Sequence, residues 1–195
     1  MKNFLSTFIV FVIVATTAMA QAEPGKVEIG AFITNLYMRD FREAPNQPGF
    51  GGRLTLNLNR NIALDSELTF LPIRDNTLGY VAKNAVQGLI GIKAGYRSER
   101  WGIYGKVRPG ATHFKGLAEG VVCAQVFPGS NACIPRDTTR LTIDYGGVAE
   151  IYPGNKTVIR FDLGDTVIRF GDERAGIANF NRNNLQYSFG VGYRF

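Results

Sequence analysis

Residues 185–195 alternate strictly between two kinds of side chain. Every second residue from Leu185 to Phe195 is large and apolar, and the residues between them are small or polar. A repeat of two residues is the period of a β-strand whose two faces meet different environments. The segment therefore predicts a β-strand ending at Phe195, and it limits the possible folds more than any other feature of the sequence.

The same alternation returns upstream, in segments that are separated by turn residues or by long polar connections. The pattern breaks in parity at Asp165, which predicts either a β-bulge near Gly164 or the end of a membrane-spanning segment. Including the C-terminal segment, we predict eight strands, at residues 26–36, 53–58, 62–70, 86–96, 101–108, 139–152, 159–163 and 185–195.

The connections between these strands alternate in length. Three are tight, near 59–61, 97–100 and 153–156, and four are long, at about 37–49, 71–84, 112–138 and 168–184. Short turns at one end and long loops at the other are typical of bacterial outer-membrane barrels, whose short turns face the periplasm. The predicted fold is all-β, an eight-stranded antiparallel up-and-down transmembrane β-barrel.

The N-terminus has the order of a secretory signal peptide. Lys2 precedes an apolar run over 4–14, and two overlapping A-x-A sites follow. We predict a signal peptide over 1–22, cleaved after Ala20 or Ala22, and a barrel domain over 23–195. The alternative is an uncleaved anchor, which the short apolar run and the missing stop-transfer charges disfavour.

The polar faces of the predicted strands carry charges of both signs. In a soluble, lipocalin-like barrel these faces would meet water, whereas in a membrane barrel they line the bore. Symmetry about the first and third tight turns places Arg53 opposite Glu67 and Glu150 opposite Arg160. Because an unpaired buried charge is costly, this placement favours the membrane barrel and predicts an interior charge network of Arg53, Asp65, Glu67, Lys93, Lys106, Arg108, Asp144, Glu150, Arg160, Asp162 and Arg194.

Two further features favour the membrane barrel. The polar faces contain many of the 23 glycines, which suits a narrow bore. Aromatic residues lie near the tight turns, where an interfacial girdle is expected: Tyr96, Trp101, Tyr152, Tyr193 and Phe195. The formal net charge of +6 is mild and unclustered, so we expect no nucleic-acid partner.

Cys123 and Cys133 flank a Pro-Gly-Ser-Asn segment within the third long connection. In an exported protein this spacing predicts a disulfide that closes the loop. Two thiols and the distant His113 are too few for a structural zinc site. We therefore expect neither a metal nor a cofactor.

The pattern over 26–195 resembles the small outer-membrane β-barrel proteins, the OmpA/OmpX-like group. Its most specific part is the last strand, which resembles the C-terminal signal read by the barrel-assembly machinery. The resemblance implies a Gram-negative outer membrane, contact with lipid and lipopolysaccharide, and an assembly signal made by Tyr187, Phe189, Val191, Tyr193 and Phe195.

The leading functional hypothesis is a non-enzymatic, monomeric barrel. Eight strands leave an interior just wide enough for side chains to fill, so function is expected in the long surface loops. One alternative is a lipid A-modifying enzyme, for which His113 and Ser66 are the available base and nucleophile. The other alternative is a soluble periplasmic ligand-binding barrel.

Overall fold

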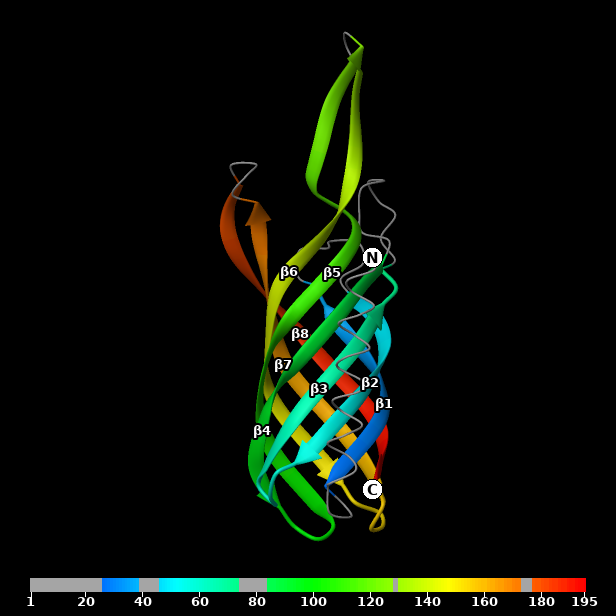
Figure 1. Ribbon diagram of the computed structural model, residues 1–195, viewed down its shortest axis with the longest axis vertical. Helices are drawn as coiled ribbons and strands as arrows, with labels where there is room; N and C mark the ends of the chain where they lie inside the picture. Colours follow the sequence, from blue (N-terminus) through cyan, green and yellow to red (C-terminus); the bar gives the residue numbers. More distant parts are fainter. Residues whose placement is uncertain (1–25, 39–45, 74–83, 128–129, 173–176) are drawn as a thin grey trace.

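The computed structural model describes residues 26–38, 46–73, 84–127, 130–172 and 177–195. These residues form one closed antiparallel barrel in which every strand pairs with its neighbours in the chain. Figure 1 shows the strands tilted around a common axis. Their bounds are β1 Val27–Tyr37, β2 Asn46–Asn57, β3 Ile62–Leu71, β4 Asn84–Arg97, β5 Trp101–Phe127, β6 Ser130–Ile151, β7 Thr157–Asp172 and β8 Ile177–Arg194.

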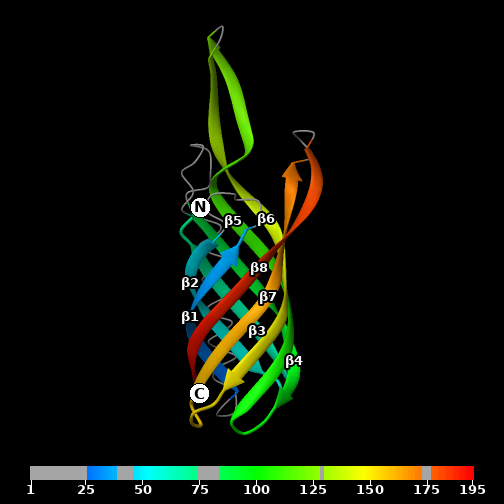
Figure 2. The ribbon, with the colours of Figure 1, turned by 180° about the vertical axis from the view of Figure 1, so that it is seen from behind.

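The first and last strands close the barrel. β1 pairs with β8 from Glu28 opposite Arg194 to Tyr37 opposite Leu185, and Figure 2 shows β8 running between β1 and β7. No helix among the described residues is long and apolar enough to cross a membrane. The prediction of an eight-stranded antiparallel barrel is confirmed.

The tight turns are held by short-range hydrogen bonds. In the β2–β3 turn, the side-chain oxygen of Asn59 accepts from the backbone N–H groups of Asn61 and Ile62, both at 2.8 Å. An Asn side chain that bonds its own downstream backbone stabilises such a turn. In the β4–β5 turn, the Ser98 N–H donates to the Trp101 carbonyl at 2.8 Å. These turns set the register of both hairpins.

The two long C-terminal connections were wrongly predicted as loops. β5 continues to Phe127 and β6 begins at Ser130, so most of 112–138 is a hairpin that projects beyond the barrel (Figure 1). β7 and β8 likewise continue to Asp172 and from Ile177. A strand that has left the bilayer needs no apolar face toward lipid, so the alternation that marks membrane strands is absent there. The predicted signal peptide over 1–22 and residues 39–45 and 74–83 lie outside the described residues.

No bulge occurs near Gly164. The register between β6 and β7 runs unbroken from Ile151 opposite Ile159 to Thr142 opposite Ile168. Asp165 therefore faces outward, where its carboxylate accepts from the Tyr145 hydroxyl at 3.3 Å. Of the two interpretations of the parity break, the structure supports the end of the membrane-spanning segment.

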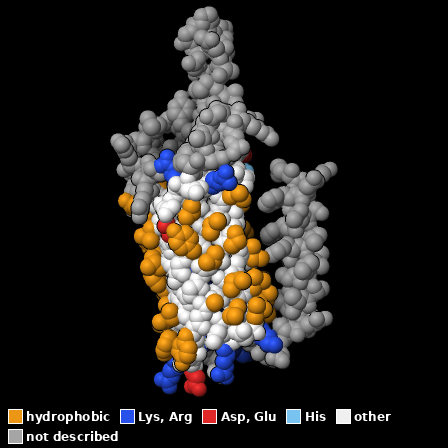
Figure 3. Space-filling model, turned by 90° about the vertical axis from the view of Figure 1, so that its left-hand side faces the viewer, with side chains coloured by type: hydrophobic (Ala, Val, Ile, Leu, Met, Phe, Trp, Pro, Cys, Tyr) orange, Lys and Arg blue, Asp and Glu red, His pale blue; other side chains and the backbone are white. Residues whose placement is uncertain are grey.

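The apolar face of the barrel points outward. Large apolar side chains such as Ile33 and Leu141 are each 66% exposed, while Asp65 and Asp144 are fully buried. Figure 3 shows apolar side chains over the visible barrel wall, with basic side chains above and below them. A soluble barrel with an apolar ligand cavity would have the opposite arrangement.

Candidate functional site

The centre of the bore is organised around Asp65 on β3. Its carboxylate accepts from both terminal nitrogens of Arg160 at 2.8 and 3.0 Å and from Arg108 at 2.9 Å. The Thr55 hydroxyl donates to the same carboxylate at 2.6 Å. Because β3, β5 and β7 supply these groups, the contacts reach across the bore and hold together strands that are not neighbours.

The remaining central charges surround this group. Arg108 pairs with Glu67 at 2.6 Å and with Asp144 at 2.6 Å. Lys106 pairs with Asp144 at 2.7 Å and also with Asp162. A bore crossed by ion pairs at this level leaves little room for solute.

Arg53 lies opposite Glu67 in the β2–β3 register, but their charged atoms are 3.9 Å apart. The Glu67 oxygen is much nearer to Arg108 than to Arg53. Glu150 lies opposite Arg160 at 3.7 Å, and its nearest partner is Lys93 on β4. The closest partners therefore come from other strands than the hairpin neighbours.

The periplasmic end of the bore is closed by charges and tyrosines. The Tyr152 hydroxyl donates to Glu150 at 2.8 Å and lies 2.8 Å from the Tyr104 hydroxyl. The guanidinium groups of Arg97 and Arg194 lie 4.6 and 4.7 Å from the centre of the Tyr152 ring, within cation–π range. Tyr152 was wrongly expected in the interfacial girdle, because the alternation that points Val148 and Glu150 into the bore points Tyr152 inward as well.

Glu28 on β1 is a buried residue that sequence reasoning missed. It accepts from Arg194 on β8 at 2.6 and 2.9 Å and from the Asn57 amide at 2.9 Å. Its position between Val27 and Ile29 placed it on the polar face, which was the available signal. With it, the charged lower part of the described bore contains six carboxylates and six cations, which are Glu28, Asp65, Glu67, Asp144, Glu150 and Asp162 against Arg53, Lys93, Lys106, Arg108, Arg160 and Arg194.

Above the charges lies a layer of uncharged polar side chains. Thr166 donates to the Gln186 side-chain oxygen at 2.7 Å, and the Thr112 and Thr142 hydroxyls lie 2.8 Å apart. The Ser188 and Thr34 hydroxyls are also 2.8 Å apart. These mutual hydrogen bonds satisfy buried groups without charge.

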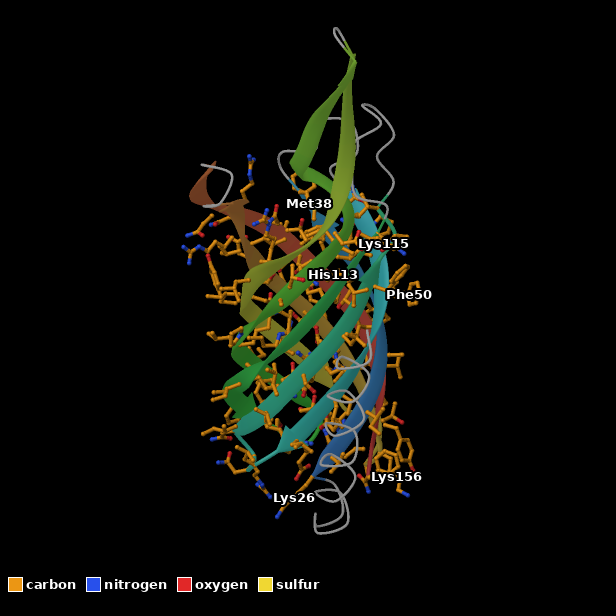
Figure 4. The ribbon with its side chains drawn as sticks, turned by 45° about the horizontal axis from the view of Figure 1, so that its top comes forward. Lys26, Met38, Phe50, His113, Lys115 and Lys156 are labelled. Carbon is orange, nitrogen blue, oxygen red and sulfur yellow. The ribbon has the colours of Figure 1, made fainter. Side chains whose placement is uncertain are left out.

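Most buried side chains at the outer end of the bore are apolar, although Gln47 is buried opposite Leu36. The apolar side chains are at most 8% exposed and form one cluster, the apolar cap, which consists of Leu36, Met38, Leu71, Ile73, Ala85, Phe114 and Ile168. In Figure 4 the labelled Met38 lies at the outer end of the barrel. The cap adds a dry layer above the polar ones.

Single strands pass through all these layers. Above the buried Tyr104, the inward residues of β5 are Lys106, Arg108, Gly110, Thr112 and Phe114 in ascending order. Above the buried Val158, those of β7 are Arg160, Asp162, Gly164, Thr166 and Ile168. The bore therefore changes from charged to neutral to apolar toward the outside.

Gly164 shows why the bore needs glycine. A Cβ there would lie 2.6 Å from the Tyr145 carbonyl oxygen, 3.1 Å from Asp144 Oδ1 and 3.2 Å from Lys106 Cε. Any side chain would therefore displace the Lys106–Asp144 pair. The residue provides space for the charges that its neighbours carry.

Comparison with known proteins agrees with this arrangement. Residues 6–195 match the family model of the outer membrane protein β-barrel domain. The chain belongs to this outer-membrane β-barrel family. It is accordingly an outer-membrane protein, and the outward apolar face meets lipid. No curated protein sequence matches the chain.

This outer-membrane barrel is similar to several solved structures at low sequence identity. Neisserial surface protein A is 10% identical, with a TM-score of 0.52 over 89% of this chain and 100% of that one. OprG from Pseudomonas aeruginosa is 13% identical, with a TM-score of 0.49 over 90% and 98%. Ail from Yersinia pestis is 13% identical, with a TM-score of 0.49 over 87% and 96%.

The two residues considered for lipid A chemistry are not brought together in this outer-membrane barrel. His113 Nδ1 lies 2.9 Å from the Thr139 hydroxyl, and the Ser66 hydroxyl donates to the Leu54 carbonyl at 3.1 Å. The register places His113 in the row of Phe70. Ser66 is four residues along β3 from that row, which is about 13 Å at about 3.3 Å per residue. Proton transfer between them requires contact.

The last candidate site residues are the two cysteines and the residue types that could bind a metal. The hairpin register places Cys123 of β5 opposite Cys133 of β6, and their disulfide stays a prediction. Among the described residues, no three His, Cys, Asp or Glu side chains are grouped as metal ligands.

Proposed function

We propose that this outer-membrane protein is a closed, non-enzymatic barrel that presents its β5–β6 and β7–β8 hairpins to ligands outside the cell. The observation that carries the proposal is the filled bore, in which ion pairs, hydrogen-bonded hydroxyls and the apolar cap follow one another. A filled bore does not support solute diffusion, so the projecting hairpins are the parts available for recognition.

The proposal is tested by separating the barrel from its hairpin. A variant in which residues 117–136 are replaced by a short Asn-Gly turn keeps the barrel, which heat-modifiable gel migration checks. Both proteins, embedded in lipid nanodiscs, are applied to arrays of glycans and extracellular-matrix proteins. Binding by the full chain and loss in the shortened variant is the expected result, and equal binding by both contradicts a hairpin role.

Two measurements test the closed and non-enzymatic parts of the proposal. Planar bilayers containing the purified protein should give no sustained conductance steps. Expression in a Gram-negative host should leave the acylation pattern of lipid A unchanged by mass spectrometry. A new lipid A species would instead support the enzyme alternative.

We further propose how the barrel reaches and keeps this state. The signal peptide is removed after Ala20 or Ala22, and Tyr187, Phe189, Val191, Tyr193 and Phe195 of the last strand engage the barrel-assembly machinery. Four of these side chains share the outward face of β8, continued by Phe195. The barrel then resides as a monomer among phospholipid and lipopolysaccharide, with Cys123 and Cys133 joined. Lower folded yield on deletion of Phe195, and mass spectrometry without reduction, are the respective tests.

A further inference from the structure

The lipid-facing wall has a hollow in its outer half. It is a shallow hollow of about 400 Å³, open to the surroundings and lined by Phe50, Gly52, Leu68, Phe70 and Val86, with neighbouring backbone. We call this feature the outer groove.

Two outward glycines lie on either side of Leu68, Gly52 in the lining of the groove and Gly88 next to it. The registers run from Gly52 to Leu68 and from Leu68 to Gly88, so the three residues form one row across β2, β3 and β4. Leu68 is 50% exposed between them. Phe50 and Phe70 form a wall in the next row, with ring centroids 5.6 Å apart. A flexible hydrocarbon chain makes more contact beside such a ridge than it would on a flat surface.

Polar and basic groups stand directly above this groove. His113 on β5 is opposite Val86, and Lys115 is opposite Asn84 one row further out. Both side chains face outward and are exposed, and Figure 4 shows Phe50, His113 and Lys115 at the outer part of the barrel. The carboxylate of Asp137 lies on the far side, on β6, where it accepts from the Gly116 N–H at 3.0 Å.

We propose that the outer groove holds one acyl chain of a phosphorylated glycolipid of the lipid A type, with a phosphate on Lys115 and His113. The apolar groove lies below the cation, which is the order of chain and phosphate in an outer-leaflet lipid. A basic side chain at the membrane surface contributes about 1 kcal/mol toward an anionic headgroup. The proposal is independent of the closed-barrel function, because it concerns only the outside wall.

The glycines provide a clean test. A Cβ atom added at Gly52 or at Gly88 would meet nothing nearer than 3.9 and 4.0 Å, respectively, so the backbone at both positions accepts a side chain. Gly105, on the outward face in the periplasmic half, is equally open at 3.8 Å and is the matched control. Arg169, outward and exposed on β7, is the control for charge removal at Lys115.

Native mass spectrometry of the folded full chain in detergent measures binding of added hexa-acylated lipid A and of dephosphorylated lipid A. The double change Gly52→Leu and Gly88→Leu should weaken lipid A binding about tenfold, as loss of contact with two methylene groups predicts. Lys115→Gln should weaken it about fivefold and abolish the preference for the phosphorylated form. Gly105→Leu and Arg169→Gln should change neither.

Equal binding by all variants would overturn the proposal, since it would reduce the groove to ordinary lipid contact. Loss of a dimer peak in the glycine variants, with lipid binding unchanged, would also overturn it and would assign the groove to a second copy of the chain. If the double variant does not fold, Val86→Trp fills the groove from its side and is subject to the same expectations. Heat-modifiable migration confirms folding in each case.

Discussion

The inward face of the barrel is ionic in its lower part and apolar at its outer end. On β7, Arg160 and Asp162 belong to the charge network, whereas Ile168 on the same face belongs to the apolar cap. The outward face changes in the opposite sense, from lipid-facing Phe161 and Leu163 to exposed Arg169. One regular strand therefore carries two opposite polarity patterns.

The difference shows that the medium outside the barrel wall, lipid or water, determines which side chains face the bore. Within the bilayer, lipid accepts the apolar side chains, so the polar ones are buried and must pair with one another. Beyond the bilayer, water accepts the polar side chains, and the hydrophobic effect drives the apolar ones inward. The boundary between the two regimes lies near Asp165 and Thr166.

The largest loss in the free energy of unfolding is expected when the central carboxylate of Asp65 is removed. Asp65→Ala removes the carboxylate that contacts both Arg108 and Arg160, so the buried site keeps its cations but loses one of the carboxylates that neutralise them. Breaking a buried ion pair costs about 3–5 kcal/mol, so we expect a loss of that size in the free energy of unfolding. Urea unfolding of protein refolded in lipid vesicles measures it. A cost below about 1 kcal/mol would mean that water reaches the network.

The second prediction tests where the bilayer ends. Ile90 is 41% exposed on the middle of β4, so Ile90→Arg should cost about 2–4 kcal/mol in the free energy of unfolding, as at the bilayer midplane. Val167 is its matched control, an outward β-branched residue above Asp165, where an arginine should cost about 0–1 kcal/mol. The same urea titration applies, and equal costs at both sites would remove the proposed boundary.

Exchanging the side chains of Thr166 and Ile168 tests the change from polar to apolar residues inside the bore. Thr166→Ile removes the hydroxyl that donates to Gln186, and Ile168→Thr adds a hydroxyl to the apolar cap. Each change leaves a buried polar group without a partner, at a cost of about 1–3 kcal/mol in the free energy of unfolding. Both costs are read from urea unfolding midpoints. A neutral Ile168→Thr would show that the cap is wet.

The smallest effect is expected at the outward carboxylate. Asp165→Ala removes only the exposed contact with Tyr145 at 3.3 Å. We expect a change below about 1 kcal/mol in the free energy of unfolding, as for exposed polar pairs. Measured beside Asp65→Ala, it compares two aspartates of the same wall that differ in the side they face. A large cost would contradict the outward placement.

The sequence was informative wherever a strand lies between lipid and a bore. Alternation at 185–195 and the tight turn near 59–61 predicted a strand and a register, and the structure has β8 there and places Arg53 opposite Glu67. Turn symmetry describes only neighbouring strands, however. The contacts of Asp65 with Arg160 cross from β3 to β7 and depend on how the sheet curls, which no local pattern encodes.

Above the bilayer the sequence was less informative. The outer parts of β5 and β6 have no lipid on one side, so they lack the repeat that identified the lower parts. Asp165 obeys the later polarity pattern, so the sequence left open whether it marks a β-bulge near Gly164 or the end of the membrane-spanning segment. Glu28 was overlooked because its strand shows the alternation only weakly.

The ion pair between Glu28 and Arg194 joins the first strand to the last, which are 166 positions apart in the chain. This ion pair forms only when the sheet closes, and the pairs of Asp65 with Arg160 and Arg108 across the bore likewise need the curled sheet. An unclosed sheet in the bilayer would therefore leave several charges without their partners at once. Closure therefore completes the pairing of these charges and stabilises the complete barrel relative to a half-assembled one.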